Sequence, residues 1–318
     1  MKTLIFLLFT HLLAILPLYA VEEDHHADAT VSATGEEDFK TVQEAINKAP
    51  QTASSEKPWV IFVKPGTYAE RVYVQREKRH IRLIGEDAAT THISFGLFAR
   101  MKGPDGLEIG TFRTPTMTID ADDFTVEKLT LANSAGPVGQ ALALRVDGDR
   151  VVFRDCVFTG YQDTIFLNRG RQYFQNCTVR GDVDFIFGGA TAWFESCTLD
   201  CIRNGYITAS STPAESRFGF VFANCTIITS PDIKVYLGRP WRPFASTIFI
   251  NTKMGSGIRP EAWHNWDQPE REKTSRYAES NSHGPGAQPD KRVPWAKQLT
   301  QTEVEKITRT EVLNGWNP

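Results

Sequence analysis

Cysteine is scarce in this sequence, with five residues among 318. An odd and small number cannot build the dense disulfide framework of small secreted domains, so the hydrophobic core must supply most of the stability. A surplus of one charge is also lacking, because 35 basic and 38 acidic side chains leave a formal net charge of −3. This balance argues against nucleic-acid and anionic-membrane binding, and an acidic substrate would need a local basic site.

Apolar runs of membrane-spanning length are missing as well. Residues 1–20 contain Lys2, a short apolar core and the terminal sequence Leu18-Tyr19-Ala20. This is the pattern of a secretory signal peptide, and the run is too short to span a bilayer. We expect a secreted monomer with a signal peptide over residues 1–20, a flexible mature N-terminus over 21–36 and one folded domain over 37–318.

Two common kinds of catalytic centre have no counterpart in the sequence. No Gly-x-Ser-x-Gly elbow accompanies His264, which argues against a Ser-His-Asp hydrolase. No compact cluster of histidine, cysteine and acidic residues suggests a zinc or calcium site. We therefore expect neither a metal nor an organic cofactor.

The sequence does contain a repeat. The pattern Phe-x-x-Cys-x-apolar occurs four times, and the steps from one cysteine to the next are 21, 20 and 28 positions: Cys156, Cys177, Cys197 and Cys225. A period in this range indicates a solenoid, and the alternation of apolar and polar residues before a Gly or Asn break indicates strands. The repeat predicts an all-β, single-domain parallel β-helix, whose crossovers should be right-handed. A leucine-rich repeat is disfavoured because its Leu and Asn framework is absent.

The segments outside the repeat carry weaker signals. Helical spacing of apolar residues over 39–49 predicts an amphipathic helix that caps the N-terminal end of the solenoid. Residues 59–63 and 81–84 are expected to be strands, 268–292 a loop, and 302–313 a short terminal helix.

Two aspartates occupy the same place in successive repeats. Asp163 follows Cys156 by seven residues, and Asp184 follows Cys177 by seven. Neighbouring strands are about 4.8 Å apart, so the two carboxylates should be close and one pKa should be raised while the other group stays charged. A protonated acid beside a charged nucleophile or base suits both ester and glycoside cleavage. Arg239, held between Gly238 and Pro240, is the candidate cation for Asp184.

Several segments resemble the signature segments of pectin methylesterases. They are Gly160-Tyr161-Gln162-Asp163-Thr164, Gly181-Asp182-Val183-Asp184-Phe185-Ile186-Phe187-Gly188 and Tyr236-Leu237-Gly238-Arg239-Pro240-Trp241. The resemblance runs from about Phe39 to the C-terminus in the family's order. Two positions depart from it: Gly139 stands where relatives often have His, and Gly189 where many have Asn.

The resemblance implies a right-handed parallel β-helix that hydrolyses the C6 methyl esters of homogalacturonan (pectin). It assigns Asp184 as nucleophile, Asp163 as proton donor and base, Gln140 and Gln162 as oxyanion donors, and Arg239 as the partner of Asp184. The expected substrate-binding residues are Arg239, Trp241, Gln140, Thr111, Phe185, Tyr161 and Trp266. A glycoside hydrolase with the same carboxylate pair and a non-catalytic binder of pectic polysaccharide are the alternatives.

The cysteine repeat also allows a disulfide. Cys177 and Cys197 are one coil apart, which is compatible with a bridge or with a ladder of reduced thiols, and we expect the bridge. Asn176 and Asn224 match the N-glycosylation pattern, but both lie inside the predicted strand unit, a poor acceptor.

Overall fold

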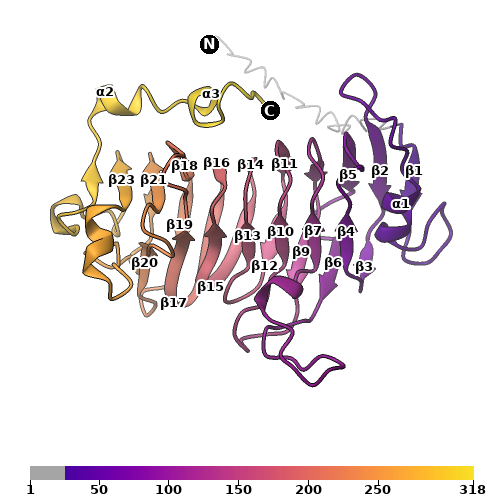
Figure 1. The fold of residues 1–318 in the computed structure, drawn as a ribbon, viewed down its shortest axis with the longest axis horizontal. Helices are drawn as coiled ribbons and strands as arrows, with labels where there is room; N and C mark the ends of the chain where they lie inside the picture. Colours follow the sequence, from indigo (N-terminus) through magenta and orange to yellow (C-terminus); the bar gives the residue numbers. More distant parts are fainter. Residues whose placement is uncertain (1–25) are drawn as a thin grey trace, which may run out of the picture.

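The structure, a computed structural model, describes residues 26–318 (Figure 1). The predicted signal peptide therefore lies outside the described residues. The chain winds into parallel strands that stack side by side, so the predicted right-handed parallel β-helix is confirmed. Within residues 26–318, no helix is long and apolar enough to cross a membrane.

One sheet runs the whole length of the solenoid, and all its neighbours pair in parallel. In stacking order its 11 strands are β1 (Ala29–Val31), β2 (Trp59–Val63), β5 (Ile81–Gly85), β8 (Thr125–Glu127), β11 (Val151–Arg154), β14 (Arg171–Gln175), β16 (Thr191–Glu195), β18 (Phe220–Ala223), β21 (Ser246–Ile250), β23 (Arg276–Ser280) and β24 (Lys297–Gln298).

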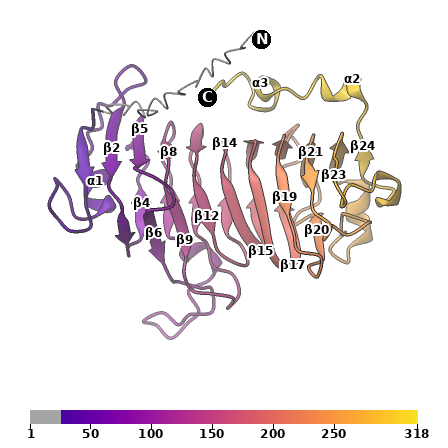
Figure 2. The ribbon, with the colours of Figure 1, turned by 180° about the vertical axis from the view of Figure 1, so that it is seen from behind.

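The second sheet has two rows of short strands, which the long strands β15 and β17 join into one (Figure 2). Its 13 strands are β3 (Gly66–Tyr68), β4 (Val72–Val74), β6 (Thr91–Phe95), β7 (Met117–Ile119), β9 (Thr130–Asn133), β10 (Leu144–Val146), β12 (Val157–Thr159), β13 (Ile165–Leu167), β15 (Thr178–Gly188), β17 (Thr198–Ser210), β19 (Thr226–Ile228), β20 (Val235–Gly238) and β22 (Lys253–Met254).

The phenylalanine of the repeat forms a stacked ladder in the core. Ring centroids of successive members are 4.6, 4.5, 4.4 and 4.6 Å apart along Phe153, Phe174, Phe194, Phe222 and Phe249. Each ring is fully buried, and the parallel register places equivalent side chains one strand spacing apart. The repeat in the sequence is thus the pattern of side chains that fill the solenoid.

The predicted Cys177–Cys197 disulfide is wrong. All five cysteines are free and buried. The Cys177 thiol donates instead to the Gln175 carbonyl oxygen at 3.3 Å, and the Cys197 thiol to the Glu195 carbonyl oxygen at 3.4 Å. Equivalent side chains on stacked parallel strands point the same way, which keeps their sulfurs about one strand spacing apart, whereas a disulfide needs about 2.05 Å.

The residue before each repeat cysteine has left-handed backbone geometry. Asp155, Asn176, Ser196 and Asn224 have φ between 53° and 56°. Asn and Asp adopt this conformation more readily than most residues, which explains the polar residue before the cysteine. The exposed Asn176 and Asn224 side chains donate to Asp155 Oδ1 and Glu195 Oε1, and their glycosylation stays a prediction.

The N-terminal end is closed as predicted by a helix, although a shorter one. Helix α1 (Val42–Lys48) buries Val42, Ala45 and Ile46 and begins after Thr41, whose hydroxyl accepts from the Glu44 N–H. Folded structure begins earlier than expected, because β1 lies within the segment 21–36 and pairs with β2. Residues 59–63 and 81–84 are strands as predicted.

The C-terminal part is more regular than predicted. The expected loop over 268–292 contains β23, which pairs with β21, and two short 3₁₀ helices, η2 (Pro269–Lys273) and η3 (Pro289–Lys291). The expected helix over 302–313 is two helical turns, α2 (Gln301–Val304) and α3 (Arg309–Val312), because Thr308 caps a new start. Figure 1 shows this segment running back along the stack from β23 toward β16.

Candidate active site

Asp163 and Asp184 lie on neighbouring coils in equivalent positions. Strand β13 pairs with β15 so that Ile165 is opposite Ile186, and each aspartate precedes its isoleucine by two residues. The Asp163 N–H donates to the Val183 carbonyl oxygen at 3.0 Å. The register predicted by counting from the cysteines is confirmed.

Both aspartates sit on unusual backbone. Their φ angles are 65° for Asp163 and 51° for Asp184, a region that non-glycine residues seldom occupy away from turns and functional sites. The pairing of β15 with β17 also shifts register between Val183 and Ile186, which marks a β-bulge. The bulge breaks the alternation of the strand and holds Asp184 outside the core while Phe185 enters it.

The surroundings shift the pKa values of the two carboxyl groups to different extents. Both side chains belong to buried residues, with Asp163 8% and Asp184 5% exposed. Burial and the neighbouring Asp184 charge raise the pKa of Asp163 well above its usual range. Burial also raises the pKa of Asp184, but two hydrogen bonds from Arg239 oppose that rise. Asp163 is therefore the better proton donor and Asp184 the better nucleophile.

Arg239 forms a bidentate pair with the Asp184 carboxylate. Its Nε donates to Asp184 Oδ1 at 2.9 Å and its Nη2 to Oδ2 at 2.7 Å. The residue follows β20, and its backbone N–H donates to the Thr208 carbonyl oxygen. The preceding Gly238 lies so close to the Thr208 hydroxyl that a Cβ would collide with it. The predicted Gly-Arg-Pro turn thus brings a positioned cation to the Asp184 carboxylate.

The two glutamines lie on adjacent coils beside the aspartates. Gln162 directly precedes Asp163, and its carbonyl oxygen accepts from the Ala141 N–H, next to Gln140. Both glutamines are half-buried. Neither side-chain amide makes a hydrogen bond to another residue of 26–318, so both are free to donate to a bound group.

Aromatic rings form a platform next to the carboxylates. Phe166 and Phe187 stack at 4.6 Å between centroids, and Trp241 meets Phe187 edge-on at 5.7 Å. Phe112, in the 3₁₀ helix η1 (Thr111–Arg113), lies 4.9 Å from Phe166 and is 45% exposed. Of the expected substrate-binding residues, the structure thus places Trp241 in this platform and Thr111 beside it.

The prediction that Phe185 contacts the substrate is wrong. Its side chain is fully buried among the core residues of the solenoid, out of reach of a polymer on the surface. Phe166 and Phe187 occupy the outer face instead, and their common register was visible in the sequence because each follows its aspartate by three residues.

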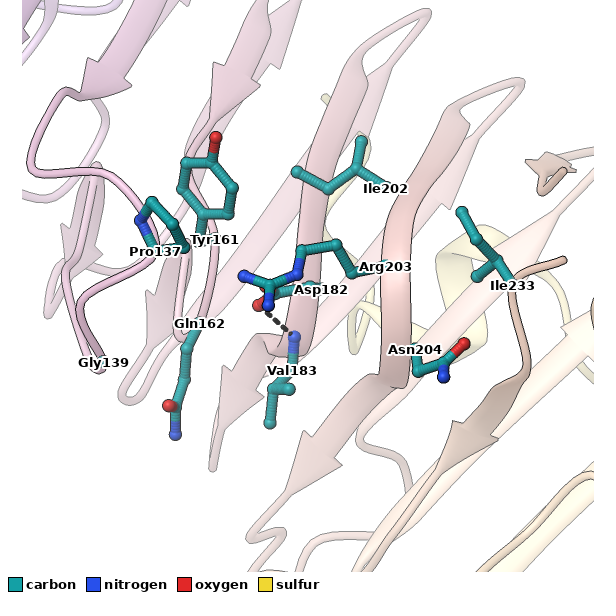
Figure 3. Close-up of a pocket in the computed structure, with 10 residues that line it drawn as sticks. All are labelled: Pro137, Gly139, Tyr161, Gln162, Asp182, Val183, Ile202, Arg203, Asn204 and Ile233. Atoms are coloured by element: carbon teal, nitrogen blue, oxygen red, sulfur yellow. Dashed lines mark hydrogen bonds and ion pairs between the residues drawn. The ribbon is translucent and has the colours of Figure 1, made fainter.

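A groove of about 520 Å³ adjoins the aspartates (Figure 3). Tyr161 and Gln162 line one side and Arg203 and Asn204 the other. The groove also contains Asp182, whose carboxylate lies 3.6 Å from the Arg203 guanidinium. Tyr161 is therefore placed where an elongated ligand could reach it. Within residues 26–318, no group of three or more His, Cys, Asp or Glu side chains could hold a metal ion.

A family model described as Pectinesterase matches residues 28–316. The chain belongs to the pectinesterase family. The curated pectinesterases that resemble it include putative pectinesterase 11 of Arabidopsis thaliana, 36% identical over 90% of this chain and 78% of the relative. Pectinesterase 4 of the same plant is 38% identical over 90% of this chain, and the match spans 50% of that longer protein.

Solved pectinesterase structures have the same fold. The pectin methylesterase from carrot has a TM-score of 0.84 and 31% identity, with 91% of this chain and 93% of that chain covered. The enzyme from Erwinia chrysanthemi has a TM-score of 0.78 and 31% identity, with 92% and 98% covered. A pectin methylesterase in complex with a hexasaccharide is similar to the same degree.

Tyr206 and Trp266 both lie against the Arg239 guanidinium. The guanidinium carbon lies 3.9 Å from the centroid of the Tyr206 ring and 3.7 Å from that of Trp266. Trp266 was among the residues expected at the site. Tyr206 was not, because nothing in its local sequence signals that β17 brings it beside the turn at Arg239.

Proposed function

We propose that the protein is a carboxylic ester hydrolase that removes methyl groups from pectin, with Asp184 as nucleophile. An ionised Asp184 oxygen attacks the C6 carbonyl carbon of a methyl-esterified galacturonate residue and forms a tetrahedral oxyanion. The bidentate Arg239 pair supports this role, because it orients the carboxylate and favours its charged form.

Asp163 then acts as the acid and the base in turn. As the intermediate collapses, the bond from carbon to the methoxy oxygen breaks, and Asp163 gives its proton to that oxygen to release methanol. The acyl-enzyme that remains is an anhydride with Asp184. Asp163, now ionised, takes a proton from water, which attacks the galacturonyl carbonyl and frees both carboxylates. The raised pKa of Asp163 supports this assignment, since a donor must be protonated before the first step.

Gln140 and Gln162 supply the donors for the oxyanion. Their side-chain amides are free of hydrogen bonds within residues 26–318 and flank the pair of aspartates. Donors that are placed in advance at the position of developing charge contribute several kcal/mol to many acyl transfers, about 3 to 4 for one donor.

The groove and the platform form the proposed pectin-binding surface. Thr111, Tyr161, Trp241 and Trp266, together with Phe166 and Phe187, border the aspartates on the outside of the solenoid. Aromatic faces suit the apolar faces of sugar rings, and an open groove suits a polymer. The hexasaccharide complex of a related pectin methylesterase is consistent with such a surface.

The observation that carries the proposal is the buried Asp163–Asp184 pair with Arg239 on Asp184 alone. The purified mature protein should be incubated with highly methylated pectin while methanol and reducing ends are measured together. Methanol without new reducing ends is the expected result. New reducing ends would indicate a glycoside hydrolase instead, and neither product across pH 4 to 9 would indicate a non-catalytic binder. Secretion is proposed with this function, because pectin is an extracellular polymer, and the monomeric state stays a prediction.

A further inference from the structure

The guanidinium of Arg239 lies between two aromatic rings, an arrangement called here the arginine clamp. Its carbon is 3.9 Å from the centroid of Tyr206 and 3.7 Å from that of Trp266. Among the described residues the two rings make no contact with each other, so they lie on different sides of the cation. The edge of the guanidinium is left to Asp184.

The Tyr206 side of the clamp is braced by its neighbours. Tyr236 stacks on Tyr206 with 5.2 Å between centroids and 8° between planes, and Arg259 lies over Tyr236 at 4.9 Å. His264 meets both tyrosines edge-on at 5.7 and 5.2 Å. Tyr206 is therefore fixed in orientation although it is only half-buried.

The Trp266 side is held by its backbone. Trp266 has φ 62°, a left-handed conformation that a bulky residue seldom adopts. Its N–H donates to His264 Nδ1 at 2.9 Å, so the same histidine braces both sides of the clamp. Backbone of this kind persists when the surrounding structure imposes it, and it concentrates at functional sites.

Stacking on two sides restricts how a guanidinium can bond. Its five donors all lie in one plane, so rings above and below leave only in-plane partners and limit rotation out of that plane. Each ring also stabilises the cation through its electron-rich face. The clamp thus favours the one rotamer in which both Nε and Nη2 reach the carboxylate.

We propose that Tyr206 is a positioning residue, which with Trp266 holds Arg239 in plane with the Asp184 carboxylate and does not itself act on the substrate. The proposal rests on the role of Asp184 in the proposed esterase. The Tyr206 hydroxyl group makes no hydrogen bond to another residue in the described part of the chain, so the face of the ring alone positions Arg239.

The groups around Asp184 determine what loosening the clamp would do. Arg239 is the cation that lowers the pKa of Asp184, whereas burial and the Asp182 charge raise it. Asp163 is the neighbouring carboxyl, and the buried Tyr277 hydroxyl also lies within reach of the Asp184 charge. A weaker hold by Arg239 therefore raises the pKa of Asp184, and the nucleophile stays protonated to higher pH.

The test is the pH dependence of methanol release by Tyr206 variants. In Tyr206→Leu, and in Tyr206→Met with its flexible side chain, the acidic limb of kcat should move up by about one pH unit with KM nearly unchanged. Tyr206→Phe keeps the ring and should retain the wild-type limb. Tyr73→Leu is the matched control, because it removes the same ring from an exposed position on β4, and it should retain the wild-type limb.

Two results would overturn the proposal. An increased KM with an unmoved acidic limb would make Tyr206 a substrate contact, and a Phe variant that behaves like Leu would assign the effect to the hydroxyl. A ¹³C-NMR titration of aspartate carboxyls without substrate, with Asp184→Asn to identify the signal, measures the same shift directly. That titration still tests the clamp if the wild-type protein releases no methanol, so the failure of either proposal is recognisable.

Discussion

Arg239 donates to both carboxylate oxygens of Asp184, at 2.9 and 2.7 Å, across 55 positions of sequence. The two residues come from different coils, and the contact forms only when β15, β17 and β20 stack in register. Their side chains are 17% and 7% exposed, so water screens the pair little. The stacked coils of the solenoid therefore bring the Arg239 cation next to Asp184 from a distant part of the sequence.

Asp184→Asn should abolish methanol release, by a factor of about 10⁴ or more, because the amide is a poor nucleophile. Asparagine has nearly the same shape and can still accept one bond from Arg239, so the fold should survive. Methanol assays and circular dichroism check both parts. Asp155→Asn is the matched control, since Asn already occupies the equivalent turn position at Asn176. Retained activity in Asp184→Asn would refute the nucleophile assignment.

Asp163→Asn should stabilise the fold at neutral and alkaline pH while it lowers activity. The folded-state pKa of Asp163 lies above its usual value of 3.8, so the folded protein holds a proton that the unfolded chain releases. The contribution of the protonated Asp163 to the free energy of unfolding is therefore complete below about pH 3.8, and it is lost as the pH rises toward the folded-state pKa. Asparagine cannot ionise and escapes this loss.

Thermal melts of wild type and Asp163→Asn across pH check this prediction. The variant should melt about 2 to 4 °C higher than wild type near pH 8, and the difference should vanish near pH 3.5. A variant that is equally destabilised at both pH values would contradict the idea that ionisation of the buried Asp163 carboxyl group destabilises the fold.

The register of the two aspartates could be predicted because a β-helix converts sequence period into spatial neighbours. Cys156 and Cys177 are one coil apart, and the residues that follow them by one to ten positions pair at the same offset of 21, which includes the aspartates. The bidentate partner was also predictable in part, since Gly238 and Pro240 frame Arg239 in a tight turn. These inferences needed only spacing and the chemistry of the side chains.

The remaining features depend on local departures from that period. The bulge in β15 breaks strict alternation, which is why Phe185 packs in the solenoid core while Phe187, also buried, belongs to the separate cluster of the platform. The clamp requires the left-handed backbone of Trp266 in a connecting segment, which no spacing rule reveals. The thiol ladder formed instead of a disulfide because side chains in register keep the spacing of their strands.

The five cysteines should all titrate as thiols. In denaturant, a thiol reagent should label five groups per chain without prior reduction, and the native protein should react slowly because every cysteine is buried. A reductant should leave the melting temperature unchanged. Labelling of three groups, rising to five after reduction, would show that a bridge forms after all.

Arg292→Met should destabilise the C-terminal end of the solenoid by about 3 to 5 kcal/mol, because it leaves the buried Glu279 carboxylate without its cation. Arg292 and Glu279 are 2% and 3% exposed and are joined by bonds at 2.9 and 3.1 Å. Adding Glu279→Leu should recover much of the loss in denaturant melts. Arg217→Met, in an exposed pair with Glu311, should change stability by less than about 1 kcal/mol.

Gln162→Ala should lower kcat about 100-fold or more with little change in KM, because an oxyanion donor acts mainly in the transition state. Gln140→Ala should behave alike, since the two amides lie on adjacent coils and neither is tied to another residue of 26–318. Gln301→Ala, at an exposed site on α2, is the control and should retain full activity. A higher KM with an unchanged kcat in Gln162→Ala would instead make this residue a ground-state contact and contradict its role as an oxyanion donor.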